Sequence, residues 1–268
     1  SGEIGEIVSM RSTTLLGPNN WRLGIKFLSP AGTVQKKPNN SELLFQIERF
    51  LSFLWAGGGT YSDYYIHQID ACCWMKDAWP EKAHALGGLH YRHPAVDQNL
   101  DTYSIEYTYP DGTKLFYYGR NMAGCHREWN SFAYGTKGSA VISAAGHDSR
   151  GIRTYKGQDM KKADLTWQAP QHTPSCYQLE FDELIDAIRG DKPYNEARRG
   201  AEASLVAAMG RMAAHTGEVI TYDQILNHEH EFAPDLDKLT VDSPAPVQPN
   251  PNGQYPVPMP GIRTKREY

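Results

Sequence analysis

An acidic side chain and an imidazole lie four residues apart, just after a run of three glycines. The run is Gly57-Gly58-Gly59, and Asp63 and His67 follow it. A helical pattern over 62–76 would put Asp63 and His67 on one face, one turn apart. Such a pair could transfer a proton, because the carboxylate would orient an imidazole that titrates near neutral pH.

The same spacing also has a structural interpretation. Asp63 could cap the helix, and His67 could be a hydrogen-bonded histidine beneath a sheet. On spacing alone the structural interpretation is the more common one, since a histidine beside a carboxylate is frequent in proteins. The glycines themselves follow a helical pattern rather than a strand, and they lack the spacing of a dinucleotide-binding fingerprint.

The composition of the chain limits the classes of function. Its 268 residues suit one large domain or two small ones, and 40% hydrophobic content supports a packed core. A net charge of −4 and a pI near 6.2 argue against a nucleic-acid surface, and no apolar run is long enough for a membrane span. The cysteines lack the spacing of a zinc site or a disulfide framework, so we expect reduced thiols and no bound metal.

Strand and helix patterns together predict the class of fold. Strands are expected at 6–15, 83–92, 102–109, 114–120, 129–134, 139–143, 151–155 and 165–168. Helices are expected at 41–55, 62–76, 175–189 and 197–215. This order predicts an α+β fold, a large and mostly antiparallel open sheet with helices packed on one face. We expect tyrosines on the other face.

The helical periodicity also predicts which side chains are buried. In the 41–55 helix they are Leu44, Ile47, Leu51 and Leu54. In the 175–189 helix they are Tyr177, Phe181, Leu184, Ile185 and Ile188. In the 197–215 helix they are Ala201, Leu205, Ala208 and Met212. We expect residues 1–230 to form this domain and the proline-rich tail, 231–268, to run extended over its surface.

Several segments, taken in order, resemble the Gfo/Idh/MocA oxidoreductase family. They are Glu3-Ile4-Gly5-Glu6-Ile7-Val8, residues 57–70, Gly135-Thr136-Lys137-Gly138, the 181–190 helix, and residues 211–217 followed by Val219-Ile220-Thr221. The resemblance implies a domain like the C-terminal domain of glyceraldehyde-3-phosphate dehydrogenase. In the family that domain follows a Rossmann domain that binds NAD or NADP. The Rossmann half has no counterpart here, so we expect a C-terminal domain alone, with Ser1 as a cloning remnant.

The resemblance favours a catalytic role for Asp63 and His67 over the structural interpretation that their spacing alone suggests. In the family, an aspartate and a histidine spaced four apart after the glycines line the active site. It therefore implies that His67 transfers the proton of the substrate hydroxyl and that Asp63 orients it. Asp70 matches the next aspartate of the family, for which a structural role is expected.

Substrate contacts are expected from the sheet face and the loops near this helix. The candidates are Tyr61, Arg120, Asn121, His126, Arg127 and Trp21. For Arg120, a solvated charge on a strand is an equally good interpretation.

Together these features predict the substrate-binding half of an NAD(P)-dependent oxidoreductase that acts on a sugar or sugar derivative. One alternative is a branch of the family that cleaves or epimerises glycosides through transient oxidation, with no net redox change. Another is a non-catalytic oligomerisation domain.

Alone, the chain is expected to be inactive and to hold no NAD or NADP. Its expected partners are a sugar-like substrate and other copies bound through the open sheet face, without nucleic acid or membrane. The resemblance is to bacterial proteins and leaves cytoplasm and periplasm open.

Overall fold

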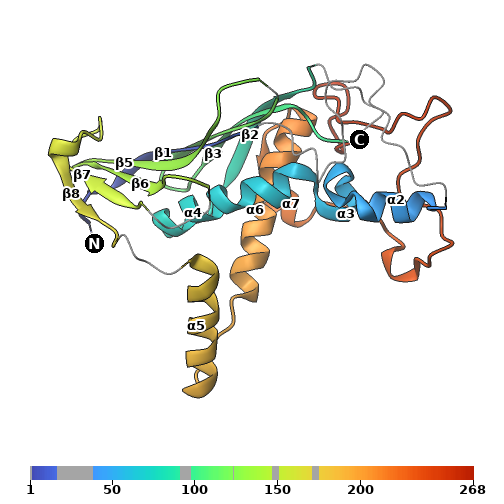
Figure 1. Cartoon of the computed structure of the whole chain (residues 1–268). Coiled ribbons are helices and arrows are strands. Elements are labelled where there is room, and N and C mark those ends of the chain that lie inside the picture. The colour runs from blue at the N-terminus through green and yellow to red at the C-terminus, as the bar shows by residue number, and fades with distance from the viewer. Residues whose placement is uncertain (1, 17–38, 91–97, 123, 147–150, 171–174) are drawn as a thin grey trace.

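The computed structural model describes residues 2–16, 39–90, 98–122, 124–146, 151–170 and 175–268 (Figure 1). Its strands form one nine-stranded sheet in the order β8-β7-β6-β5-β1-β4-β3-β2-β9. The strands are β1 (Ile7–Leu16), β2 (Lys82–Gly88), β3 (Thr102–Thr108), β4 (Lys114–Asn121), β5 (Glu128–Gly135), β6 (Ser139–Ser143), β7 (Arg153–Tyr155), β8 (Leu165–Gln168) and β9 (Ile220–Thr221). Among these strands only the β1–β4 pairing is parallel. The predicted α+β fold is confirmed.

The helices are α2 (Glu42–Glu48), α3 (Leu54–Gly57), α4 (Ile66–Lys76), α5 (Cys176–Arg189), α6 (Ala197–Thr216) and α7 (Tyr222–Leu226). Helices α4 and α6 lie along one face of this sheet, whereas α2 and α3 extend beyond its end (Figure 1). Helix α4 packs on β1, β5 and β6, and α6 packs on β2 and β3. None of the helices in the described ranges is both long and apolar enough to cross a membrane.

Tyrosines of the β3–β4 hairpin fill the space between the sheet and the helices. The fully buried ones are Tyr103, Tyr107, Tyr109 and Tyr117. The expectation of a tyrosine-rich open face was therefore wrong, because the alternation places these rings toward the helices. The exposed large side chains on the strands include Val8, Leu86 and Tyr118.

The segment predicted as one helix over 41–55 is broken into shorter pieces. Helix α2 ends at Glu48, a 3₁₀ turn covers Phe50–Ser52, and the extended residue Phe53 separates that turn from α3. The break shifts the buried face, so Leu44 and Ile47 are exposed, contrary to prediction. Leu51 and Leu54 lie beyond α2 and are buried as expected.

Helix α5 forms where predicted, and Ser175 caps it by accepting a hydrogen bond from the Gln178 amide. Its apolar stripe, however, is not buried. The exposed members are Tyr177, Phe181, Ile185 and Ile188, with exposed fractions from 41% to 65%. Figure 1 shows that α5 projects away from the sheet, and these four side chains remain largely exposed.

Helix α6 is buried on a face that differs from the predicted one. Ala201 is exposed and Met212 is buried, while Val206, Ala207 and Met209 are completely covered. The periodicity failed here because all residues from Met209 to Thr216 are buried, which leaves no polar face to mark the outside.

The tail beyond residue 230 is irregular, with a 3₁₀ turn at Leu236–Lys238. It does more than cross the surface. Val247 and Tyr255 pack with Phe45 and Phe53 in a second apolar cluster, and near its end Glu267 is buried beside α6.

Gly210 in α6 allows the tightest contact between this helix and the sheet. A Cβ at this position would lie 1.9 Å from Tyr107 Oη. Gly210→Ala should therefore lower the free energy of unfolding by about 1–3 kcal/mol, measured by chemical denaturation. The matched control is Gly200→Ala in the same helix, where a Cβ meets nothing within 4 Å and where alanine should stabilise by up to about 1 kcal/mol. Equal effects of the two substitutions would contradict the packing argument.

Candidate functional site

The candidate site is built on the helix that follows the glycine turn. Gly58 and Gly59 have φ of +68° and +72°, a conformation that L side chains rarely adopt. A single π turn, Tyr61–Tyr65, follows them and continues directly into α4. Such π turns occur often at functional sites. The helix predicted over 62–76 is thus α-helical from Ile66 to Lys76, and its first residues form the π turn, which was not predicted.

Two tyrosines hold the π turn against the core. The hydroxyl of Tyr61 lies 2.8 Å from that of Tyr107, and the Tyr65 hydroxyl accepts a hydrogen bond of 3.1 Å from Asn121 Nδ2. Each ring occupies space that a glycine leaves. A Cβ at Gly210 would lie 2.6 Å from Tyr61 Oη, and one at Gly119 would lie 2.2 Å from the Tyr65 ring. Burial raises the pKa of Tyr61 well above its usual value, so its hydroxyl stays neutral.

Two of the predicted substrate-binding residues, Tyr61 and Asn121, are buried in this packing. Tyr61 is 0% exposed and Asn121 is 5% exposed. Their polar groups bond to Tyr107 and Tyr65 inside the protein, so in this structure neither residue reaches the surface. Both residues thus support the helix from its buried side, and their role in substrate binding stays a prediction.

Asp63 and His67 are less buried than Tyr61 and Tyr65 of the same segment. His67 is exposed and Asp63 is half-buried, whereas Tyr65, Gln68 and Ile69 between and beside them are fully buried. Neither predicted residue is therefore completely buried. Their role in proton transfer stays a prediction.

Asp70 lies further along the same helix and pairs with α6. Its carboxylate accepts a hydrogen bond of 2.9 Å from Arg199. The Arg199 guanidinium also lies 4.1 Å from the ring centroid of Trp74 and 5.0 Å from that of Trp79. Burial raises the pKa of Asp70, and the charge of Arg199 partly offsets this effect. These contacts are those of a residue that joins two helices, as expected from the sequence.

The remaining candidates lie where β4 ends and β5 begins. Arg120 Nη2 donates a hydrogen bond to the His126 carbonyl, which braces the connection between these strands. His126 and Arg127 are exposed. Trp21 lies outside the described residues. The structure thus groups Arg120, His126 and Arg127, and Asn121 joins this strand end to the candidate helix through Tyr65.

Two other kinds of site, a cysteine nucleophile and a metal centre, were considered in the described residues. Cys72 and Cys73 are buried free thiols, and burial raises the pKa of Cys73 to about 12, which opposes a nucleophilic role. No group of three or more His, Cys, Asp or Glu side chains within the described ranges is arranged to hold a metal ion.

The glycine turn itself does not fit a dinucleotide phosphate. A Cβ at Gly59 would lie 2.5 Å from Asn99 Oδ1, and one at Gly58 would lie 2.9 Å from Arg211 Nη1. The space that the glycines leave is therefore filled by protein side chains. Asn99 also accepts a hydrogen bond from the Thr60 amide at the start of the helix, 2.7 Å long.

Sequence reasoning assigned no role to Asn99, Arg211 or Glu267. One signal was available for Arg211, since it and His215 are four residues apart in an otherwise apolar half of a helix. Charged residues in such a segment usually have buried partners. The partner, Glu267, lies 56 residues further along an irregular tail, so no pattern could have pointed to it.

No family model and no curated protein matches the sequence. Solved structures do match. An aldose-aldose oxidoreductase from Caulobacter crescentus is 17% identical with a TM-score of 0.58, over 82% of this chain and 57% of that chain. A myo-inositol 2-dehydrogenase from Lactobacillus plantarum is 18% identical with a TM-score of 0.52, over 82% and 58%. A UDP-N-acetylglucosamine 3-dehydrogenase from Acidithiobacillus ferrooxidans is 13% identical with a TM-score of 0.51, over 78% and 54%.

At these identities the similarity establishes the fold. The chain has the fold of the C-terminal domain of Gfo/Idh/MocA-type oxidoreductases, which confirms the resemblance at the level of structure. It spans 54% to 58% of the length of the three solved proteins named above.

The bond between Tyr65 and Asn121 should stabilise the candidate helix. Tyr65→Phe would leave the buried Asn121 amide without this partner, which should cost about 1–3 kcal/mol of unfolding free energy in urea denaturation. The control is Tyr118→Phe at a ring that is 39% exposed, where we expect a change within about 0.5 kcal/mol. An unchanged midpoint for Tyr65→Phe would show that the bond does not hold the helix.

Proposed function

We propose that this chain is the substrate-binding half of an NAD(P)-dependent oxidoreductase that acts on a sugar or sugar derivative. In this proposal His67 is the catalytic group that transfers the hydroxyl proton, and Asp63 orients it. One observation carries the proposal. The helix after the glycine turn is anchored by the buried rings of Tyr61 and Tyr65, and it leaves His67 exposed and Asp63 half-buried.

The similar solved proteins support the substrate class. Their names describe dehydrogenases or oxidoreductases of an aldose, of inositols and of a nucleotide sugar. All of these are polyhydroxylated molecules. Oxidation of an alcohol on such a molecule needs a base for the hydroxyl proton, and a neutral imidazole is the usual side chain for this step. An exposed histidine beside a half-buried carboxylate has the required chemistry.

The other half of the reaction would come from outside this chain. A bound nicotinamide would supply the acceptor for the hydride. Because side chains fill the space beside Gly58 and Gly59, we assign no cofactor-holding residue here. A separate nucleotide-binding half would complete the site, in keeping with the shorter length of this chain relative to the similar solved proteins.

The catalytic assignment is tested in the longer protein that includes a nucleotide-binding half. His67→Ala should lower turnover of the sugar substrate by about 10²–10⁴-fold, the usual contribution of a general base. The control is His84→Ala, which removes another exposed histidine, on β2, whose side chain lies near Glu106. It should leave turnover unchanged. Turnover within a few-fold of wild type for His67→Ala would refute the assignment.

The proposal that the nicotinamide cofactor binds outside this chain is tested with the chain alone. Titration of residues 1–268 with NAD or NADP, followed by calorimetry, should show no measurable binding. The longer protein serves as the positive control. Tight binding to the isolated chain would mean that this chain holds the cofactor itself, and the assignment of two halves would fail.

A further inference from the structure

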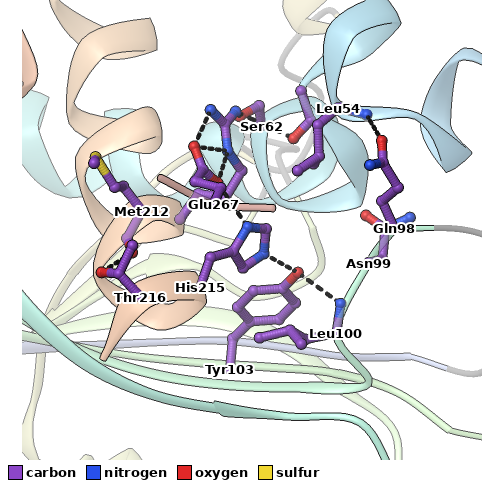
Figure 2. A network of polar contacts seen from close by, with 12 residues as sticks. Leu54, Ser62, Gln98, Asn99, Leu100, Tyr103, Met212, His215, Thr216 and Glu267 are labelled. Atoms are coloured by element: carbon purple, nitrogen blue, oxygen red, sulfur yellow. Dashed lines mark hydrogen bonds and ion pairs between the residues drawn. The ribbon is translucent and has the colours of Figure 1, made fainter. Parts of the chain in front are cut away.

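Arg211 makes two sets of contacts with the two ends of its guanidinium. Nε and Nη2 donate to the Glu267 carboxylate, with bonds of 2.9 Å to each oxygen and a longer one of 3.3 Å (Figure 2). At the other end, Nη1 donates to Ser62 Oγ at 2.6 Å and to the Gly58 carbonyl at 3.2 Å. A single buried cation therefore joins the C-terminal tail to the glycine turn.

Gly58 is shaped to receive this guanidinium. Its φ of +68° favours glycine, and a Cβ there would lie 2.9 Å from Arg211 Nη1 and 2.7 Å from the Ser62 Cβ. The backbone of the turn can therefore approach Arg211 only because this position has no side chain.

Glu267 has further partners that fix the direction of its carboxylate. His215 Nδ1 lies 2.6 Å from Glu267 Oε2, and His215 Nε2 lies 3.1 Å from the Tyr103 hydroxyl. Tyr103 in turn accepts a hydrogen bond from the Leu100 amide, as Figure 2 shows. Burial lowers the pKa of His215. A neutral imidazole protonated at Nδ1 satisfies the network, because it donates to Glu267 and accepts from Tyr103.

The charges of the network are strongly coupled. Burial alone would raise the pKa of Glu267, but the cation Arg211 and the bond from His215 outweigh it and lower this pKa to about 2. A buried ion pair of this kind adds little net stability compared with apolar side chains of the same size. Its clearest physical effect is geometric, since a bidentate pair fixes the guanidinium in one orientation.

We propose that Arg211, held by Glu267, is a positioning residue that fixes the first turn of the helix carrying Asp63 and His67. Ser62 is the neighbour of Asp63 in the chain, so its bond to Arg211 sets the rotation of the helix at that point. The inner side of the helix is set by Tyr61 and Tyr65, and Arg211 sets its beginning. The inference rests on the proposed function for the importance of His67, whereas its geometric part concerns this chain alone.

The test uses the whole chain and two readouts. One is amide hydrogen exchange over residues 58–67, and the other is the imidazole ¹H–¹³C resonance of His67, identified by its loss in His67→Ala. Ser62→Ala removes one bond of Arg211 and leaves the Arg211–Glu267 pair intact. Arg211→Met removes both sets of contacts. We expect exchange over 58–67 to become about tenfold faster or more in each variant, as for the loss of a hydrogen bond to a charged group, and the His67 resonance to shift.

Arg199→Met is the matched control, because Arg199 also belongs to α6 and pairs with Asp70, which lies in the same target helix beyond residues 58–67. It should leave exchange over 58–67 and the His67 resonance unchanged. The proposal is overturned if Ser62→Ala changes neither readout, or if Arg211→Met speeds exchange equally throughout the chain. If Arg211→Met fails to fold, Ser62→Ala decides.

The two proposals can fail separately. Normal turnover of His67→Ala in the longer protein would refute the catalytic role while leaving the exchange result valid. In that protein, Ser62→Ala should lower kcat with little change in KM, because the variant displaces the catalytic pair without removing a substrate contact. An unchanged kcat, together with full activity loss in His67→Ala, would overturn positioning and retain the proposed function.

Discussion

The close packing of Tyr61 and Tyr65 against two glycines is the constraint on which the candidate site depends. One ring fits against α6 at Gly210 and the other against β4 at Gly119. Both rings belong to the same π turn, so this turn packs against both the sheet, at β4, and helix α6. Rotation of the helix would drive ring atoms into the backbone, and protein interiors do not absorb such overlap. The outer face of the helix is therefore determined by what lies beneath it.

Electrostatic contacts act on the same turn from another direction. The apolar contacts come from below, whereas the buried pair of Arg211 and Glu267 approaches the glycine turn from the side of α6 and the tail. Removal of one charge would leave the other buried without a partner, at a cost of about 3–5 kcal/mol. The tail thus takes part in the fold despite its lack of regular structure. Stability and site geometry depend here on the same few side chains.

Local patterns in the sequence predicted most of the elements. Alternation located β3 and β4, and Ser175 and Gly217 marked a helix start and a helix end. Periodicity was less reliable for burial. It reports that the stripe of α5 is apolar and cannot report what covers it. It also cannot detect the break near Phe53, where a second short helix starts with a different phase.

The site was predictable to the extent that it depends on spacing. The spacing of four from Asp63 to His67 predicts a shared helix face, and the resemblance to a family gave that face a chemical meaning. The π turn was not predictable, because it accompanies the fit of distant residues such as Gly119 and Gly210. The same holds for Tyr61, whose hydroxyl bonds to Tyr107 on a strand 46 residues away. Long-range partners of this kind leave no periodic signal.

The place of β1 in the sheet has a consequence for the order of folding. This strand is first in the chain but lies at the centre of the sheet, where Ser9 pairs with Lys114 on one side and with Tyr134 on the other. The hairpins β3–β4 and β5–β6 are local and can form early, whereas β1 has to wait for both of its neighbours. Pairing between strands so distant in sequence is slow. From this topology we expect the two halves of the sheet to form before the central seam at β1 closes.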